Sequence, residues 1–145
     1  MSSLYFRGKL SYASAFANPP DDCGGGIYVI VPGRGLCPPG ARIDLVGLRA
    51  IARVPVDPED ERYRAPLCRD AALLAERLHP GDAAVLLGSI ATPKYLPALR
   101  ETFGAHLRVP QEFIGRGDMS RGSLMLRCVR ERRELTYVAP VPQEG

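Results

Sequence analysis

Two segments of the chain combine glycines, hydroxyls and charged side chains beside apolar runs. They are residues 86–95 (LLGSIATPKY) and residues 113–122 (FIGRGDMSRG). Glycine-rich turns of this kind bring backbone amides and cationic side chains up to a bound anion. The two segments therefore predict an anion-binding edge, although they do not identify the anion.

The first segment offers a backbone and hydroxyl site with one ammonium group. Gly88 would let a ligand approach the main chain, Ser89 and Thr92 carry hydroxyls, and Lys94 adds a compact positive charge. The G-x-x-x-x-G-K-[ST] spacing of a P-loop is missing. The alternative is a tight strand-to-helix turn in which Thr92 or a neighbour caps the following helix.

The second segment offers two guanidinium groups on either side of a carboxylate. Arg116 and Arg121 are five residues apart and could both fork onto one anion. Asp118 lies between them, which suits a general base or a group that orients a water molecule. The alternative is that Asp118 pairs with one of the arginines only to brace the loop.

A third loop follows the apolar run 27–31 and carries Arg34 between two glycines. The G-x-G resembles part of a dinucleotide-binding fingerprint, but Pro38 and Pro39 prevent a helix from opening there in the required way. We predict an irregular loop that adds Arg34 as a third wall of the site.

The elements that must position these loops alternate between strands and helices. Continuous apolar runs at 27–31 and 83–87 predict buried strands, and apolar spacings of three and four predict helices at 67–78 and 96–103. Residues 4–17 favour a short helix, 107–110 a short strand, and 124–130 with 135–138 a C-terminal β-hairpin. We therefore predict an α/β fold: a single three-layer domain over 1–145 with a partly parallel sheet. If the first two strands are parallel neighbours, the loops that follow them, at 33–36 and 88–94, meet at one edge, while the sequence leaves open whether the loop at 115–122 converges with them.

Composition limits the remaining function classes. The chain has 145 residues, of which 46% are hydrophobic and 24% charged, with a net charge of +3. This is typical of one globular domain. No apolar run approaches a membrane span and no signal peptide is visible, so we expect a cytoplasmic protein with no membrane partner.

Histidine and cysteine chemistry is disfavoured by number and spacing. The four cysteines form no C-x-x-C pair, and neither His79 nor His106 lies near one of them. We therefore predict no metal site, no cofactor and no Ser-His or Cys-His catalysis.

Of the 19 basic residues only Lys9 and Lys94 are lysines. Lysine, unlike arginine, changes its pKa readily on burial.

The two segments also resemble an uncharacterised bacterial protein family that carries LLGSIATxKY and FxGRGDMSRG runs, over about residues 84–127. This resemblance implies no activity and no catalytic residue. The predicted layout is more loosely similar to uracil-DNA-glycosylase-like and nucleoside-deoxyribosyltransferase-like α/β folds. A similarity at fold level is a weak guide to function.

Two functional hypotheses follow. The first is a small α/β protein that binds a phosphate-bearing or nucleoside-type ligand and, as a hydrolase or N-glycosidase-like enzyme, uses Asp118 as its base. The second is a non-enzymatic module in which the basic region 116–133, with six arginines against two acidic residues, contacts nucleic acid or an acidic protein. A homodimer that completes the site is compatible with the first, because 145 residues leave little room for a deep pocket beside a core.

Overall fold

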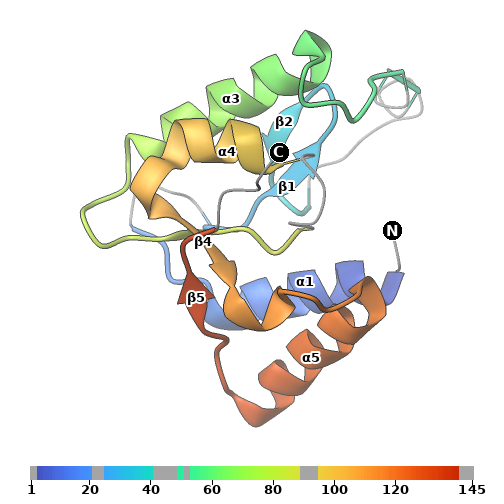
Figure 1. Ribbon diagram of the computed structural model, residues 1–145, viewed down its shortest axis with the longest axis vertical. Helices are drawn as coiled ribbons and strands as arrows, with labels where there is room; N and C mark the ends of the chain where they lie inside the picture. The colour runs from blue at the N-terminus through green and yellow to red at the C-terminus, as the bar shows by residue number, and fades with distance from the viewer. Residues whose placement is uncertain (1–2, 21–24, 41–48, 51–52, 89–94, 141–145) are drawn as a thin grey trace.

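The computed structural model describes residues 3–20, 25–40, 49–50, 53–88 and 95–140, and it shows a mixed α/β fold (Figure 1). The helices are α1 (Ser3–Phe16), α3 (Glu61–Ala75), α4 (Leu96–Phe103) and α5 (Asp118–Glu131), with 3-10 turns η2 (Gly104–His106) and η3 (Gln111–Phe113). The strands are β1 (Val29–Val31), β2 (Gly35–Cys37), β3 (Ala84–Val85), β4 (Leu107–Pro110) and β5 (Tyr137–Val138). The predicted helices at 4–17 and 96–103 and the strand at 107–110 are confirmed within a residue, and the helix predicted at 67–78 is present but runs from Glu61 to Ala75.

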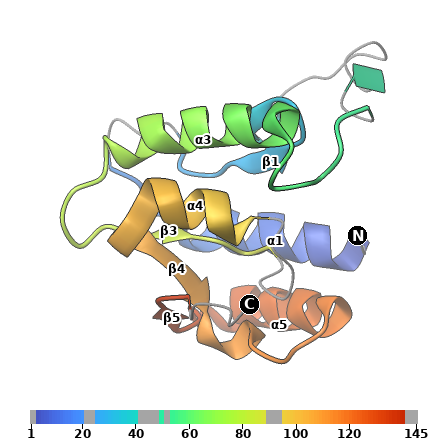
Figure 2. The same cartoon turned by 45° about the horizontal axis from the view of Figure 1, so that its top comes forward.

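The sheet containing β3, β4 and β5 is partly parallel, as predicted. β3 pairs with β4 in parallel, with Ala84 opposite Leu107, and β4 pairs with β5 antiparallel, with Val109 opposite Val138. Helix α4 connects β3 to β4, which is the crossover that a parallel pair requires. In both ribbon views α3 and α4 lie on one side of this sheet and α1 and α5 on the other (Figures 1 and 2). Two apolar clusters correspond to these two sides.

The strand predicted at 27–31 has a different partner from the one expected. β1 forms an antiparallel two-stranded sheet with β2, and its residues are only partly buried. Among the described strands, β1 does not pair with β3. The glycines explain this: Gly33 and Gly35 both have positive φ, so the chain turns back directly instead of entering a crossover.

The predicted C-terminal hairpin over 124–130 and 135–138 is wrong. Residues 118–131 form α5, and the apolar residues that suggested a strand bury one face of this helix: Leu124, Met125 and Cys128. Their spacing of one, three and four residues fits a helix as well as a strand. β5 pairs with β4 instead.

Helices α1 and α5 meet at two glycines, Gly8 and Gly122. A Cβ added at Gly8 would lie 2.8 Å from the carbonyl oxygen of Gly122. A Cβ added at Gly122 would lie 2.9 Å from the carbonyl oxygen of Leu4 and 3.0 Å from the Cα of Tyr5. The two backbones are therefore in direct contact, and side chains on either side of the glycines are brought to the same place.

Substitution of Gly122 by alanine tests this contact. Helix propensity alone would make alanine about 1 kcal/mol more favourable. The added methyl group meets backbone atoms that no rotamer change can move, so we expect a net destabilisation of at least about 1 kcal/mol. Urea denaturation measures the difference. Gly40→Ala is the control, since nothing lies within 4 Å of its Cβ. A Gly122→Ala protein as stable as the wild type would contradict direct backbone contact.

Candidate functional site

A cavity of about 240 Å³ opens between α1, β1 and the chain that follows β3. We call it the Lys9 cavity. Its walls are mostly apolar, with Leu86, Leu87 and Gly88 contributing the segment after β3 and Tyr28 and Tyr95 adding two phenol groups. Among the described residues that line it, Lys9 is the only one with a charged side chain. The described lining therefore combines one positive charge with mostly apolar surroundings.

Tyr5 links α1 to the segment that follows β3. Its hydroxyl donates a hydrogen bond to the carbonyl oxygen of Leu87 at 2.6 Å. The ammonium nitrogen of Lys9 lies 4.3 Å from the centroid of the Tyr5 ring, in cation–π geometry. Burial raises the pKa of Tyr5, and hydrogen bonding to Arg121 opposes that rise. The phenol therefore stays protonated and donates to Leu87 across the neutral pH range.

Lys9 sits in an environment that disfavours its charge. Burial lowers the pKa of its ammonium group, and the negative charge of Asp118 partly offsets this. Asp118 also raises the pKa of Tyr95, although burial is the larger cause there. The side chain of Asp118 is 51% exposed, at the first turn of α5. The charge of Asp118 thus raises the pKa of one group on α1, Lys9, and of one at the start of α4, Tyr95.

Arg121 is 4% exposed and is held inside the protein. Its Nη2 donates to the carbonyl oxygen of Phe113 at 3.0 Å, and its guanidinium carbon lies 5.4 Å from the centroid of the Phe113 ring. Nη1 is 3.9 Å from Oδ1 of Asp118. Its Nε is buried and has no hydrogen-bond partner. Arg121 therefore braces the connection between η3 and α5.

Arg116 is also engaged within this connection. Its Nε donates to the carbonyl oxygen of Glu112 at 3.0 Å and its Nη1 to Oγ of Ser120 at 3.0 Å. Both predicted clamp arginines therefore have protein partners and, with Asp118, lie around the start of α5. The structure brings these three residues together, but only Asp118 has a side chain that is largely exposed.

Of the four site residues predicted in the segment 86–95, the structure describes Gly88. Gly88 lines the Lys9 cavity, and a Cβ added to it would lie 3.0 Å from Cε2 of Tyr95. Ser89, Thr92 and Lys94 lie outside the described residues. Tyr95, which lies beside Gly88, has its pKa raised by burial and, to a lesser extent, by the charge of Asp118.

Arg34 lies in the turn between β1 and β2, away from this cluster. Gly35 packs against Pro66 and Asp70 of α3, and the amide of Leu36 donates to Oδ2 of Asp70 at 3.0 Å. In Figure 1 this hairpin and α5 lie at opposite ends of the molecule. The structure does not bring Arg34 to Asp118. The condition for convergence, a parallel pairing of the strands at 27–31 and 83–87, is not met.

Sequence reasoning missed the residues that α1 contributes. Tyr5 and Lys9 look like parts of an ordinary apolar helix, and their position depends on the close approach of α5. The scarcity of lysine was a usable signal, since one of only two lysines is the charged residue in the cavity.

In the described parts of the chain, no group of three or more His, Cys, Asp or Glu side chains is arranged to hold a metal ion. No helix in those parts is long and apolar enough to cross a membrane.

Comparisons with protein-family models, curated proteins and solved structures find no match to this chain.

The lowered pKa of Lys9 predicts a pH-dependent contribution to stability. Between the folded-state pKa and the ordinary value of 10.5, the folded protein binds fewer protons at Lys9 than the unfolded chain. The stability of the wild type should therefore rise with pH across that window, relative to Lys9→Met, which has no such group. Urea denaturation of both proteins at pH 8, 9 and 10 measures the difference. A difference that stays constant or falls with pH would contradict the burial of this charge.

Proposed function

We propose that the protein binds a small phosphate-bearing or nucleoside-type ligand in the Lys9 cavity. The proposal rests on the charge pattern of this cavity, whose described lining is mostly apolar and has Lys9 as its one charged side chain. Small-molecule sites are typically apolar hollows with a few polar groups that fix orientation. A ligand with an aromatic or apolar body and one anionic group complements this pattern.

An anion would bind more strongly to Lys9 than to a lysine on the surface. Charges interact more strongly where water is excluded, and the protein already bears the cost of keeping this ammonium group partly buried. Gly88 has no side chain to separate a ligand from the backbone, and Tyr95 packs beside it. Ser89, Thr92 and Lys94, which follow Gly88 in the chain, remain proposed contributors of hydroxyls and a second ammonium group.

We further propose that any catalysis at this site is hydrolytic, with Asp118 as the base. Its carboxylate is half-exposed and is not among the residues that line the cavity, but its charge shifts the pKa of Lys9 and Tyr95, which do line it. In cleavage of an N-glycosidic bond, Asp118 would accept a proton as water adds to the anomeric carbon. The C–N bond breaks with its electron pair going to the nucleobase nitrogen, a proton from solvent neutralises the leaving nucleobase, and Asp118 then releases its proton to water. Arg121 and Arg116 would hold the start of α5 in place for this step.

Exchange of Lys9 tests binding. We expect Lys9→Met to weaken the binding of nucleoside 5′-monophosphates at least tenfold, about 1.4 kcal/mol, because it removes the cation from the cavity. Isothermal titration calorimetry with a panel of the common monophosphates measures this. Arg7→Gln is the matched control, because Arg7 is exposed on the same helix and does not line the cavity. Equal loss in both variants, or no binding by the wild type, would overturn the proposal.

Exchange of Asp118 tests catalysis separately. We expect Asp118→Asn to reduce release of free base from nucleosides or their monophosphates by at least about a hundredfold, the usual contribution of a general base. Ligand affinity should change little, because Lys9 remains. Chromatography of the products and calorimetry on the same variant measure the two effects. Turnover equal to that of the wild type would remove Asp118 from the mechanism.

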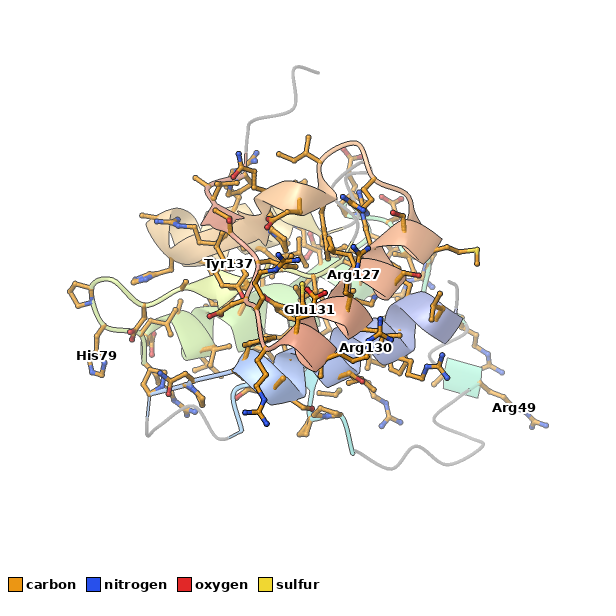
Figure 3. All side chains as sticks on the ribbon, turned by 90° about the horizontal axis from the view of Figure 1, so that it is seen from below. Arg49, His79, Arg127, Arg130, Glu131 and Tyr137 are labelled. Carbon is orange, nitrogen blue, oxygen red and sulfur yellow. The ribbon has the colours of Figure 1, made fainter. Side chains whose placement is uncertain are left out.

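The exposed arginines of α5 support a second candidate function, contact with nucleic acid or an acidic protein. Arg127 and Arg130 are exposed and three residues apart, so they share one face of the helix (Figure 3). Arg132 and Arg133 follow at its C-terminal end, although Arg133 pairs with Glu131 at 3.2 Å. Phosphate contacts of this kind would make affinity fall steeply with salt.

A further inference from the structure

A second cavity, of about 340 Å³, lies at the other end of α1. We call it the Glu134 cavity. Tyr12 and Phe16 line it from α1, Asp82 from the turn before β3, and Glu134 and Tyr137 from the chain between α5 and the end of β5. It adjoins the Lys9 cavity, since Ala13, Tyr28 and Leu87 are among the residues that line both.

A chain of hydrogen bonds fixes the polar groups of this cavity. The hydroxyl of Tyr137 donates to Oε2 of Glu134 at 2.8 Å, and the amide of Leu135 donates to the hydroxyl oxygen of Tyr12 at 2.8 Å. The two phenol oxygens are 2.5 Å apart. Because the Tyr137 proton is directed to Glu134, Tyr12 must donate its own proton to Tyr137. Both phenol protons are thereby committed, and the chain ends on a carboxylate.

Burial keeps this chain protonated. It raises the pKa of Tyr137, and the hydrogen bonds with Tyr12 and Glu134 raise it further. Burial likewise raises the pKa of Tyr12. The phenols therefore do not ionise near neutral pH, and the negative charge of the group stays on Glu134, whose side chain reaches solvent.

The described lining of the Glu134 cavity has the opposite charge pattern to that of the Lys9 cavity. It includes the carboxylates of Glu134 and Asp82 and no basic side chain. One oxygen of Asp82 is already committed, since Oδ2 accepts from the amide of His79 at 2.8 Å. The remaining lining includes the aromatic rings of Phe16 and Tyr28, and the ring of Phe16 lies 4.7 Å from that of Tyr12, centroid to centroid.

We propose that the Glu134 cavity is a binding site for an ammonium group carried on a small aromatic or apolar body. A carboxylate that can still accept hydrogen bonds pairs with the ammonium protons, and aromatic faces attract a cation. The apolar part of the ligand packs between α1 and the segment before β3. Although the two cavities share lining residues, this proposal is tested apart from the proposed function, because its ligand needs no anionic group.

Three probes of matched shape test the charge preference. Phenethylamine, phenethyl alcohol and phenylacetate differ in the group at the end of one aromatic body. Titration followed by ¹⁵N-edited NMR should show phenethylamine binding at least fivefold more tightly than the alcohol, with phenylacetate weakest here. The shifts should involve the amides of Leu135 and Tyr137. Binding of the amine no tighter than the alcohol would overturn the proposal and would indicate a neutral, hydroxylated ligand instead.

Glu134→Gln tests the carboxylate without removing its hydrogen bond. The amide oxygen can still accept from Tyr137, so the phenol chain and the fold should persist. We expect the amine to bind this variant no more tightly than the alcohol. Glu131→Gln is the control, because Glu131 pairs with Arg133 and does not line the cavity. An amine preference that survives Glu134→Gln would contradict the assignment. Absence of nucleotide binding would leave this result unaffected and would overturn only the proposed function.

Discussion

The contact between Gly8 and Gly122 is the constraint on which the candidate site depends. It lets α1 and α5 approach until their backbones touch. Tyr5 and Lys9 flank Gly8, and Asp118 and Arg121 precede Gly122 by one turn of helix or less. Close packing therefore joins a cation and a phenol from one end of the chain to a carboxylate and a buried guanidinium from the other. A side chain at either glycine would separate these groups.

The charged groups around this contact play unequal parts. Arg121 and Arg116 are satisfied mainly by the protein, and they hold the start of α5 against η3. Lys9 lines a mostly apolar cavity where burial disfavours its charge, and the Tyr5 ring and the charge of Asp118 partly compensate for that cost. The Lys9 cavity and the Glu134 cavity adjoin along α1, so one helix lines two cavities whose described side chains carry opposite charges.

Local sequence patterns predicted much of the fold and part of the site. The spacing of Leu67, Ala71 and Leu74 predicts α3, because residues three and four positions apart lie on one face of a helix. Gly104 ends α4 with the positive φ expected of a C-terminal cap. The run 124–129 was wrongly predicted as a strand, because a nearly continuous apolar segment shows neither the period of a helix nor that of a strand. The cluster around Asp118 was predicted from residue types, whereas Lys9 was not, because its place in the cavity is set by packing between segments more than 100 residues apart.

We propose that a small anion binds between α1 and the segment after β3. NMR titration of the ¹⁵N-labelled protein with a nucleoside 5′-monophosphate locates this binding. We expect the perturbed amides to cluster at Lys9, at Leu87 and Gly88, and at Tyr95, which line one cavity. Perturbations confined to the outer face of α5, around Arg127 and Arg130, would contradict it and would favour the basic helix as the binding surface.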